Sequence, residues 1–111
     1  LKDINFLKDF STLEGSSLDF SENQIKDLSP LANVKKLSFL SLSNNQIKDL
    51  SPLSNLKRFN GLYLYGNKIS DLKPLQNIEK ADFIIIDDNN ISNFKVLEEL
   101  KKKGRINSYM K

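Results

Sequence analysis

Apolar residues recur along this chain in blocks of 22 residues whose internal rhythm changes halfway. Each block opens with apolar residues at alternate positions, as in Leu40-Ser41-Leu42, and continues with apolar residues three apart, as in Leu50 and Leu53. A period of 2 is typical of a short strand, and a period of 3 is typical of a tight helical turn. The pattern therefore predicts a unit of one strand and one coil that is repeated along the chain.

One stretch marks every block. It reads Asn-Gln-Ile-Lys-Asp-Leu-Ser-Pro-Leu from Asn45 to Leu53, and the last copy has decayed. The four copies start at Asn23, Asn45, Asn67 and Asn89. A fixed period of this length indicates stacked units, none of which can bury its apolar face alone.

The blocks fit the pattern Leu-x-x-Leu-x-Leu-x-x-Asn-x-Ile-x-x-Leu-x-x-Leu over residues 15–100. This pattern resembles the leucine-rich repeat family, and within it the 22-residue class of which the bacterial internalins are typical. The resemblance implies an α/β fold, a right-handed solenoid with a short parallel sheet on its concave face and 3-10 turns on its convex face. It also implies non-catalytic recognition of a protein partner.

The N-terminal segment departs from the repeat. Residues 1–14 carry the apolar rhythm of a coil without a preceding strand, with Phe10 and Leu13 continuing the spacing of Ile4 and Leu7. They form either a short helical cap or the cut end of a longer repeat array, and we favour the cap. Residues 15–111 then form the solenoid with its C-terminal cap, and the whole chain forms a single domain.

The C-terminal segment also departs from the repeat. Helical spacing of apolar residues and a run of lysines predict a helix over 95–103, with Asn93 as its N-cap and Gly104 in a left-handed conformation after it. Continuing the 22-residue period predicts a fifth parallel strand from Arg105 to Tyr109, which closes the solenoid.

The recurrent polar residues are expected to be structural. An asparagine amide at the bend after each strand can bond backbone groups that are otherwise unpaired. The Ser-Pro and Lys-Pro pairs suit the first turn of a helix, with serine as the cap. We assign the recurrent acids to the same turns and not to a carboxylate site; they are Asp27, Asp49 and Asp71.

Composition narrows the functions. Lys and Arg number 17 against 14 Asp and Glu, and a net charge of +3 supports a nucleic-acid partner only weakly. The chain has no Cys, no His and no glycine-rich phosphate loop, so we expect no enzyme, no catalytic residue and no cofactor. Asp87-Asp88 matches no known metal loop, and no apolar run approaches the roughly 20 residues that span a bilayer.

Strand side chains alternate, so the neighbours of the inward leucines face solvent on the concave sheet face. Read across the units, these neighbours form three columns. They are Ser17, Phe39, Gly61, Phe83 and Arg105; Asp19, Ser41, Tyr63, Ile85 and Asn107; and Ser21, Ser43, Tyr65, Asp87 and Tyr109.

These columns carry more aromatic area than a solvated sheet needs, which is typical of an interface. The predicted partner-binding residues are Phe39, Tyr63, Tyr65, Phe83, Ile85, Asp87 and Tyr109. A sheet about 24 Å wide suits a peptide, a helix or one edge of a larger protein. Alternatively, a second copy covers these rings in a weak homodimer, or they are tolerated singly.

A second surface is a lysine ridge that Glu79 interrupts. Its members occupy corresponding positions; they are Lys35, Lys36, Lys57, Arg58, Lys80, Lys101, Lys102 and Lys103. The alternative function is a structural or regulatory module of a larger protein that binds an acidic partner through this ridge. The ridge is a poor reader of bases, so nucleic acid is not the expected partner. Lysines at positions where internalin repeats favour threonine favour the cytoplasm over secretion or the cell surface.

Overall fold

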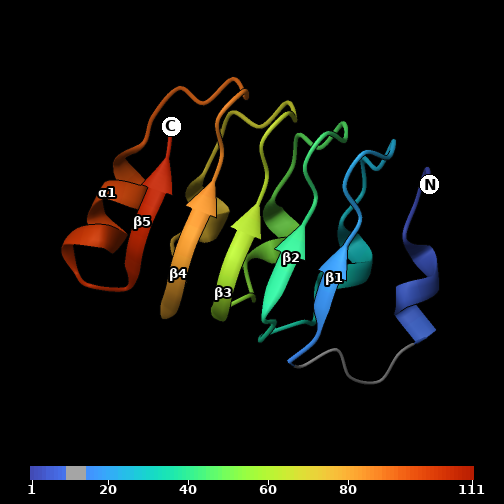
Figure 1. The fold of residues 1–111 in the computed structure, drawn as a ribbon, viewed down its shortest axis with the longest axis horizontal. Helices are drawn as coiled ribbons and strands as arrows, with labels where there is room; N and C mark the ends of the chain where they lie inside the picture. Colours follow the sequence, from blue (N-terminus) through green and yellow to red (C-terminus); the bar gives the residue numbers. More distant parts are fainter. Residues whose placement is uncertain (10–14) are drawn as a thin grey trace.

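A computed structural model describes residues 1–9 and 15–111 and confirms the stack of strand-and-coil units (Figure 1). One parallel sheet contains five strands in chain order. The strands are β1 (Ser17–Asp19), β2 (Phe39–Ser41), β3 (Arg58–Tyr63), β4 (Lys80–Ile85) and β5 (Ile106–Met110). The first four strands begin earlier than the alternating pattern predicts, because pairing between neighbouring units extends toward the preceding turn. Each of them ends one residue before its predicted last residue.

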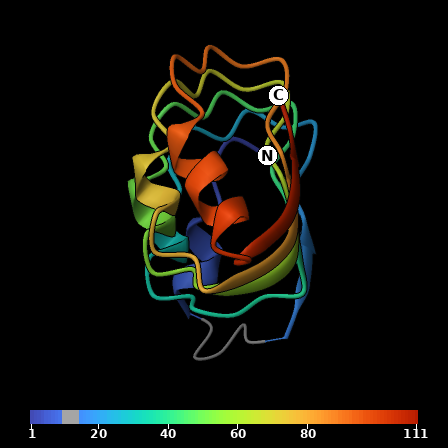
Figure 2. The same ribbon diagram turned by 90° about the vertical axis from the view of Figure 1, so that its left-hand side faces the viewer.

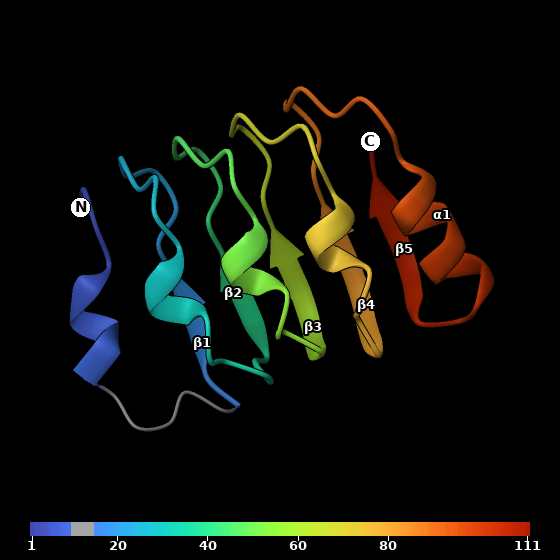
Figure 3. The same cartoon turned by 180° about the vertical axis from the view of Figure 1, so that it is seen from behind.

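The helical turns all lie on the other side of the molecule from the sheet (Figures 2 and 3). They are the 3-10 helices η1 (Asn5–Asp9), η2 (Ser29–Leu31), η3 (Ser51–Leu53) and η4 (Lys73–Leu75), followed by the α-helix α1 (Lys95–Lys102). We call the sheet face that points away from these turns the concave face. No helix of residues 1–9 and 15–111 covers this face, so its side chains are the ones open to a partner.

The interior is a set of apolar rows that cross the units. Leu40, Leu62 and Ile84 lie opposite one another in adjacent strands, and all three are fully buried. Burying each such side chain stabilises the fold by about 1.5–3 kcal/mol before the entropy of ordering is counted. Each row is completed by the next unit, so stability is collective.

The recurrent asparagines join each bend to the unit before it, which confirms their structural role. The Asn67 Oδ1 accepts a hydrogen bond from the Ile47 N–H at 3.1 Å, and its Nδ2 donates to the Leu42 and Leu64 carbonyls at 2.9 and 3.0 Å. Asn45 and Asn89 repeat these bonds one unit away on either side. Buried backbone groups at the bends are thereby satisfied.

The recurrent acids bond the first residue of each helical turn from two positions before it, and the N-cap residues are Leu28, Leu50 and Leu72, so serine is not the cap that the sequence predicts. The Asp49 Oδ1 accepts the Ser51 N–H at 2.8 Å, and Asp27 and Asp71 bond in the same way to the residues two positions later. Hydrogen bonds from the Ser51 side chain and backbone lower the pKa of Asp49. Asn93 occupies the equivalent position and accepts the Lys95 N–H at 2.9 Å.

The C-terminal unit corrects the predicted register. Ile106 lies opposite Ala81 and Tyr109 lies opposite Ile84, so the last two strands align at a spacing of 25 residues and not 22. The cause is α1, which is longer than a 3-10 turn and ends at Lys102. Its boundary residue is Phe94, one position after the predicted cap, while Gly104 adopts the expected left-handed conformation at φ 74°.

The N-terminal segment packs as the helical half of a unit. Ile4 and Leu7 are buried in the core, and the Leu1 carbonyl accepts the Gln24 N–H at 2.8 Å. Phe10 and Leu13 lie outside the described residues. The 3-10 conformation of η1 is the one that the convex turns share, and it agrees with both interpretations of the segment.

Candidate functional site

Side chains on the concave face lie in rows across β1 to β4, at the positions that the strand alternation predicts. Phe39, Gly61 and Phe83 are opposite one another in one row. Tyr63 and Ile85 are opposite one another in the next. The sheet thus brings residues from three different units together.

Three of the predicted residues contact one another and form what we call the aromatic cluster: Phe39, Tyr63 and Phe83. The ring centroids of Tyr63 and Phe83 are 5.2 Å apart in an edge-to-face arrangement, and those of Phe39 and Phe83 are 6.4 Å apart. Aromatic pairs at these separations attract each other beyond the effect of their buried area. The cluster is therefore held in place before any partner binds.

Gly61 allows the cluster to close. A Cβ atom placed on Gly61 would lie 2.4 Å from Cζ of Phe83 and 2.9 Å from Cδ1 of Phe39. The two rings lean over the bare backbone of β3 from either side, so the absence of a side chain at this position shapes the surface.

Mutual contact leaves less aromatic area open than the sequence suggests. Phe39 and Tyr65 are each 40 % exposed, whereas Tyr63, Phe83 and Ile85 are half-buried. The surface open to a partner therefore consists of partly covered rings, among which Phe39 and Tyr65 are the most exposed.

The third predicted column differs from expectation. The Tyr65 hydroxyl accepts a hydrogen bond from Asn44 Nδ2 at 3.4 Å, so its ring is directed back toward the preceding unit. Ser43, its counterpart in that unit, is only 1 % exposed and not open to solvent as predicted. Its hydroxyl makes no hydrogen bond within the described residues. Because the hydroxyl is buried, a docking protein cannot reach it directly.

Asp87 and Tyr109 are the other two predicted site residues. Asp87 is half-buried, and its Oδ1 is covered without a hydrogen-bond partner in the described part of the chain, which leaves only its other oxygen for a partner. Tyr109 does not belong to the concave column. The register of β5 turns it toward the core, where its ring stacks on Phe94 with centroids 6.4 Å apart.

The register shift also replaces the other two predicted members of β5. Ser108 lies opposite Phe83 and Met110 lies opposite Ile85, in the places assigned to Arg105 and Asn107. Met110 is 56 % exposed and extends the apolar row of Ile85. The residue spacing alone could not reveal this, because the length of α1 sets the register.

Acidic side chains on this face are dispersed. Hydrogen bonds from the Ser21 hydroxyl and backbone N–H lower the pKa of Asp19 in the row of Tyr63. Asp82 Oδ1 accepts a bond from Asn107 Nδ2 at 3.3 Å. Among residues 1–9 and 15–111, no three acidic side chains are grouped in a way that could hold a metal ion.

The structure divides the predicted lysine ridge. Glu79 contacts Arg58 Nε at 3.3 Å and Lys57 Nζ at 4.0 Å, so it neutralises the middle of the ridge as expected. Lys101 and Lys102 belong to α1 and are not on a strand. The ridge is thus a set of strand-start residues and a separate helix end.

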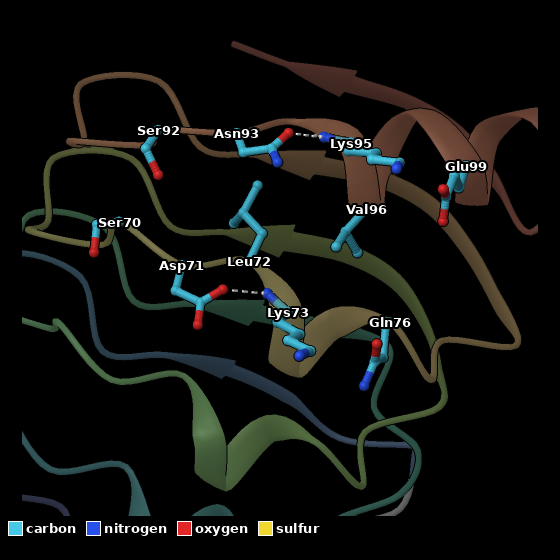
Figure 4. A pocket seen from close by; sticks show the side chains of 10 residues that line it. All are labelled: Ser70, Asp71, Leu72, Lys73, Gln76, Ser92, Asn93, Lys95, Val96 and Glu99. Atoms are coloured by element: carbon cyan, nitrogen blue, oxygen red, sulfur yellow. Dashed lines mark hydrogen bonds between the residues drawn. The ribbon is translucent and has the colours of Figure 1, made fainter.

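A groove of about 470 Å³ lies on the convex side between η4 and α1 (Figure 4). Its lining includes Asp71 and Asn93, whose side-chain oxygens already accept hydrogen bonds from the backbone N–H groups of Lys73 and Lys95. These side chains serve the turns, so the groove is a weaker candidate than the concave face. None of the helices in the described ranges is long and apolar enough to cross a membrane.

A solenoid of strand-and-3-10 units with an asparagine at each bend defines a repeat protein of the leucine-rich class. The chain matches the family described as leucine-rich repeats (2 copies) over residues 16–55 and again over 35–77. It belongs to the leucine-rich repeat family, and its units are of the internalin type.

Two solved structures from Listeria monocytogenes show the same fold. Internalin C2 is 35% identical with a TM-score of 0.79, and the match covers 98% of this chain and 46% of that protein. Internalin F is 36% identical with a TM-score of 0.82, and the match covers 92% of this chain and 29% of that protein. This chain thus spans less than half of either. No curated protein matches it.

Proposed function

We propose that this chain binds a protein or peptide partner without catalysis, through its concave face and with the aromatic cluster as anchor. Leucine-rich repeat domains generally mediate protein–protein interaction, so the family supports a binding role. The observation that carries the proposal is the contact of Phe39, Tyr63 and Phe83 over Gly61, on a sheet face that no helix in the described part of the chain covers.

Physical chemistry supports these rings as the anchor. Binding energy concentrates in a few aromatic residues near the centre of an interface. Rings that already contact one another lose little conformational freedom when a partner docks, so more of the interaction energy appears as affinity. The interior does not need them, because the rows of Leu62 and its neighbours are complete beneath.

The surroundings of the cluster supply a mixed rim. Tyr65 and Ile85 add apolar contact beside the cluster, and Asp87 adds a half-buried carboxylate whose Oδ1 is covered. An apolar centre with a polar edge is the usual anatomy of an interface. Tyr109 is not part of the proposed site, because it packs against Phe94.

The test compares immobilised wild-type protein with the Tyr63→Ala, Phe83→Ala double variant in capture from a lysate of the source cells. A matched control carries Lys73→Ala and Gln76→Ala on the convex groove. We expect the wild type and the control to retain the same protein and the cluster variant to retain at least tenfold less, since about 1.4 kcal/mol of lost contact suffices.

Circular dichroism and thermal unfolding must show that the cluster variant is folded. Retention of the same protein by wild type and folded cluster variant would exclude the cluster as the anchor. Size-exclusion chromatography of both proteins tests the homodimer: a wild-type dimer that the cluster variant converts to monomer would make a second copy the partner.

A further inference from the structure

Four basic residues lie side by side at the first residue of β3 and β4 and shortly before β2 and β5. Lys36 is bridged to Arg58, and Arg58 lies opposite Lys80. Arg105 follows beside Lys80, because Ile106 pairs with Ala81 and the Arg105 carbonyl accepts the Ala81 N–H at 2.8 Å. All four side chains are exposed. We call Lys36, Arg58, Lys80 and Arg105 the basic row.

The basic row exists because of the altered register of the last unit. At a spacing of 22 residues, Lys80 would align with Lys102, which is instead part of α1. The 25-residue spacing brings Arg105 into line and extends the row across β5. The row therefore differs from the lysine ridge predicted from the sequence, which does not include Arg105. The 22-residue spacing instead assigns Arg105 to the concave column of Phe39 and Phe83.

Such a row works against folding. Adjacent strands are about 4.8 Å apart, and like charges on neighbouring strands repel. Glu79 relieves only Arg58 in this row, at 3.3 Å. In the described part of the chain, no ion pair joins Lys36, Lys80 or Arg105 to an acid. Positive charge is therefore unbalanced at this edge.

The edge also has a shape that can receive a ligand. A groove of about 420 Å³ lies there, and its lining includes Lys36, Arg58 and Lys80 together with Phe59, Asn60 and an acidic residue, Asp82. Gly61, beneath the aromatic cluster, is three residues along β3 from Arg58, a distance of about 10 Å at the rise of a strand. One extended segment can contact both surfaces.

We propose that the basic row binds a short acidic stretch of the partner, next to the apolar residues that dock on the aromatic cluster. The proposal rests on the proposed function and names the chemistry of its partner. Charge complementarity carries it: the four cations span roughly 14 Å, the length of about five extended residues, of which about three direct their carboxylates to the same side.

The rest of the concave face favours a short acidic stretch over a long polyanion. The strand ends opposite the basic row carry Asp19, Asp87 and Asp88, and Asp82 lies between the row and the cluster. A nucleic-acid backbone crossing the sheet meets these carboxylates, and the net charge of +3 does little to offset them. A peptide can place its acids at one end only.

The test measures fluorescence anisotropy of labelled hexaglutamate at low salt, with hexaglutamine and oligo(dT) as comparison probes. The row variant carries Lys36→Gln, Lys80→Gln and Arg105→Gln. The control variant carries Lys26→Gln, Lys48→Gln and Lys68→Gln, which are exposed residues in the coils after the strands and remove the same charge.

We expect hexaglutamate binding that the row variant weakens at least tenfold and the control variant less than threefold, while hexaglutamine does not bind. Added salt should weaken it steeply. The Tyr63→Ala, Phe83→Ala variant should bind hexaglutamate as the wild type does, so failure of the aromatic anchor is distinguishable. Three outcomes overturn the proposal: no hexaglutamate binding by the wild type, an equal loss of hexaglutamate affinity in the row and control variants, or tighter binding of oligo(dT) than of hexaglutamate through the same row.

Discussion

The interior and the concave face of this solenoid obey opposite rules along the same strands. Interior rows repeat from unit to unit, as in Leu40, Leu62 and Ile84. One position away, the row of Phe39 and Gly61 changes from a ring to no side chain at all. A repeated residue packs against its copies in neighbouring units, so the stack constrains its identity. An unrepeated residue has no such constraint and is available to bind a partner outside the chain.

The sharpest way to break this comparison is to truncate one interior residue and its concave neighbour in parallel. Leu62 is fully buried at the centre of the stack, so Leu62→Ala should lower the free energy of unfolding by about 2–5 kcal/mol. Tyr63→Ala, one residue later on the concave face, should cost clearly less. Urea denaturation measures both, and equal losses would show that the concave face is also part of the folding core.

The asparagine row should show the next largest effect. Asn67→Ala leaves the Ile47 N–H without its acceptor, while the Leu42 and Leu64 carbonyls each keep one amide donor, from Asn45 and Asn89. Because the Ile47 N–H is buried, we expect a loss of about 1–3 kcal/mol and faster hydrogen exchange at the Ile47 amide.

Asn23→Ala is the matched control at the end of the row. The Asn23 Nδ2 donates within its own unit, to the Phe20 and Ser21 carbonyls, and its side chain is only partly buried. Its replacement should cost less than that of Asn67. The reverse order of losses would mean that the asparagines act singly and not through the stack.

The sequence predicted what the repeat enforces. The strands, the buried rows and the asparagine bonds all follow from a local pattern that every unit repeats, and the left-handed Gly104 follows from its place after the last helix. The aromatic rows across β1 to β4 were likewise predictable, because strand alternation and a 22-residue register place Phe39, Tyr63 and Phe83 together.

The sequence could not predict what depends on one particular unit. The register of β5 depends on the length of α1, which carries no strand periodicity, so Arg105 and Tyr109 were misplaced. The left-handed position in the bend after each of β1 to β4 also cannot be predicted from the pattern, because Glu22, Asn44, Gly66 and Asp88 share no residue type although their φ angles are all positive, at 56–72°. Packing between rows, as at Ser43, is equally invisible to a pattern along the chain.

The smallest expected change in stability tests the concave face itself. In Gly61→Ala, the new Cβ meets ring atoms of Phe83 and Phe39 and not backbone, and Gly61 lacks the positive φ of Gly104. The rings must therefore swing apart while the strand stays in place, at a cost of about 1 kcal/mol. We expect altered near-ultraviolet circular dichroism of the aromatic residues and severalfold weaker binding of the partner captured by the wild type.

Gly104→Ala separates this effect from instability. Gly104 has a φ of 74° and no other atom within 4 Å of a Cβ placed there, so alanine strains the backbone by about 1 kcal/mol and leaves the cluster alone. The two variants should be similarly stable and differ in binding. Undiminished binding by Gly61→Ala would mean that the partner does not require the closed arrangement of the rings. The unrepeated residues of the concave face would then not be explained by partner binding.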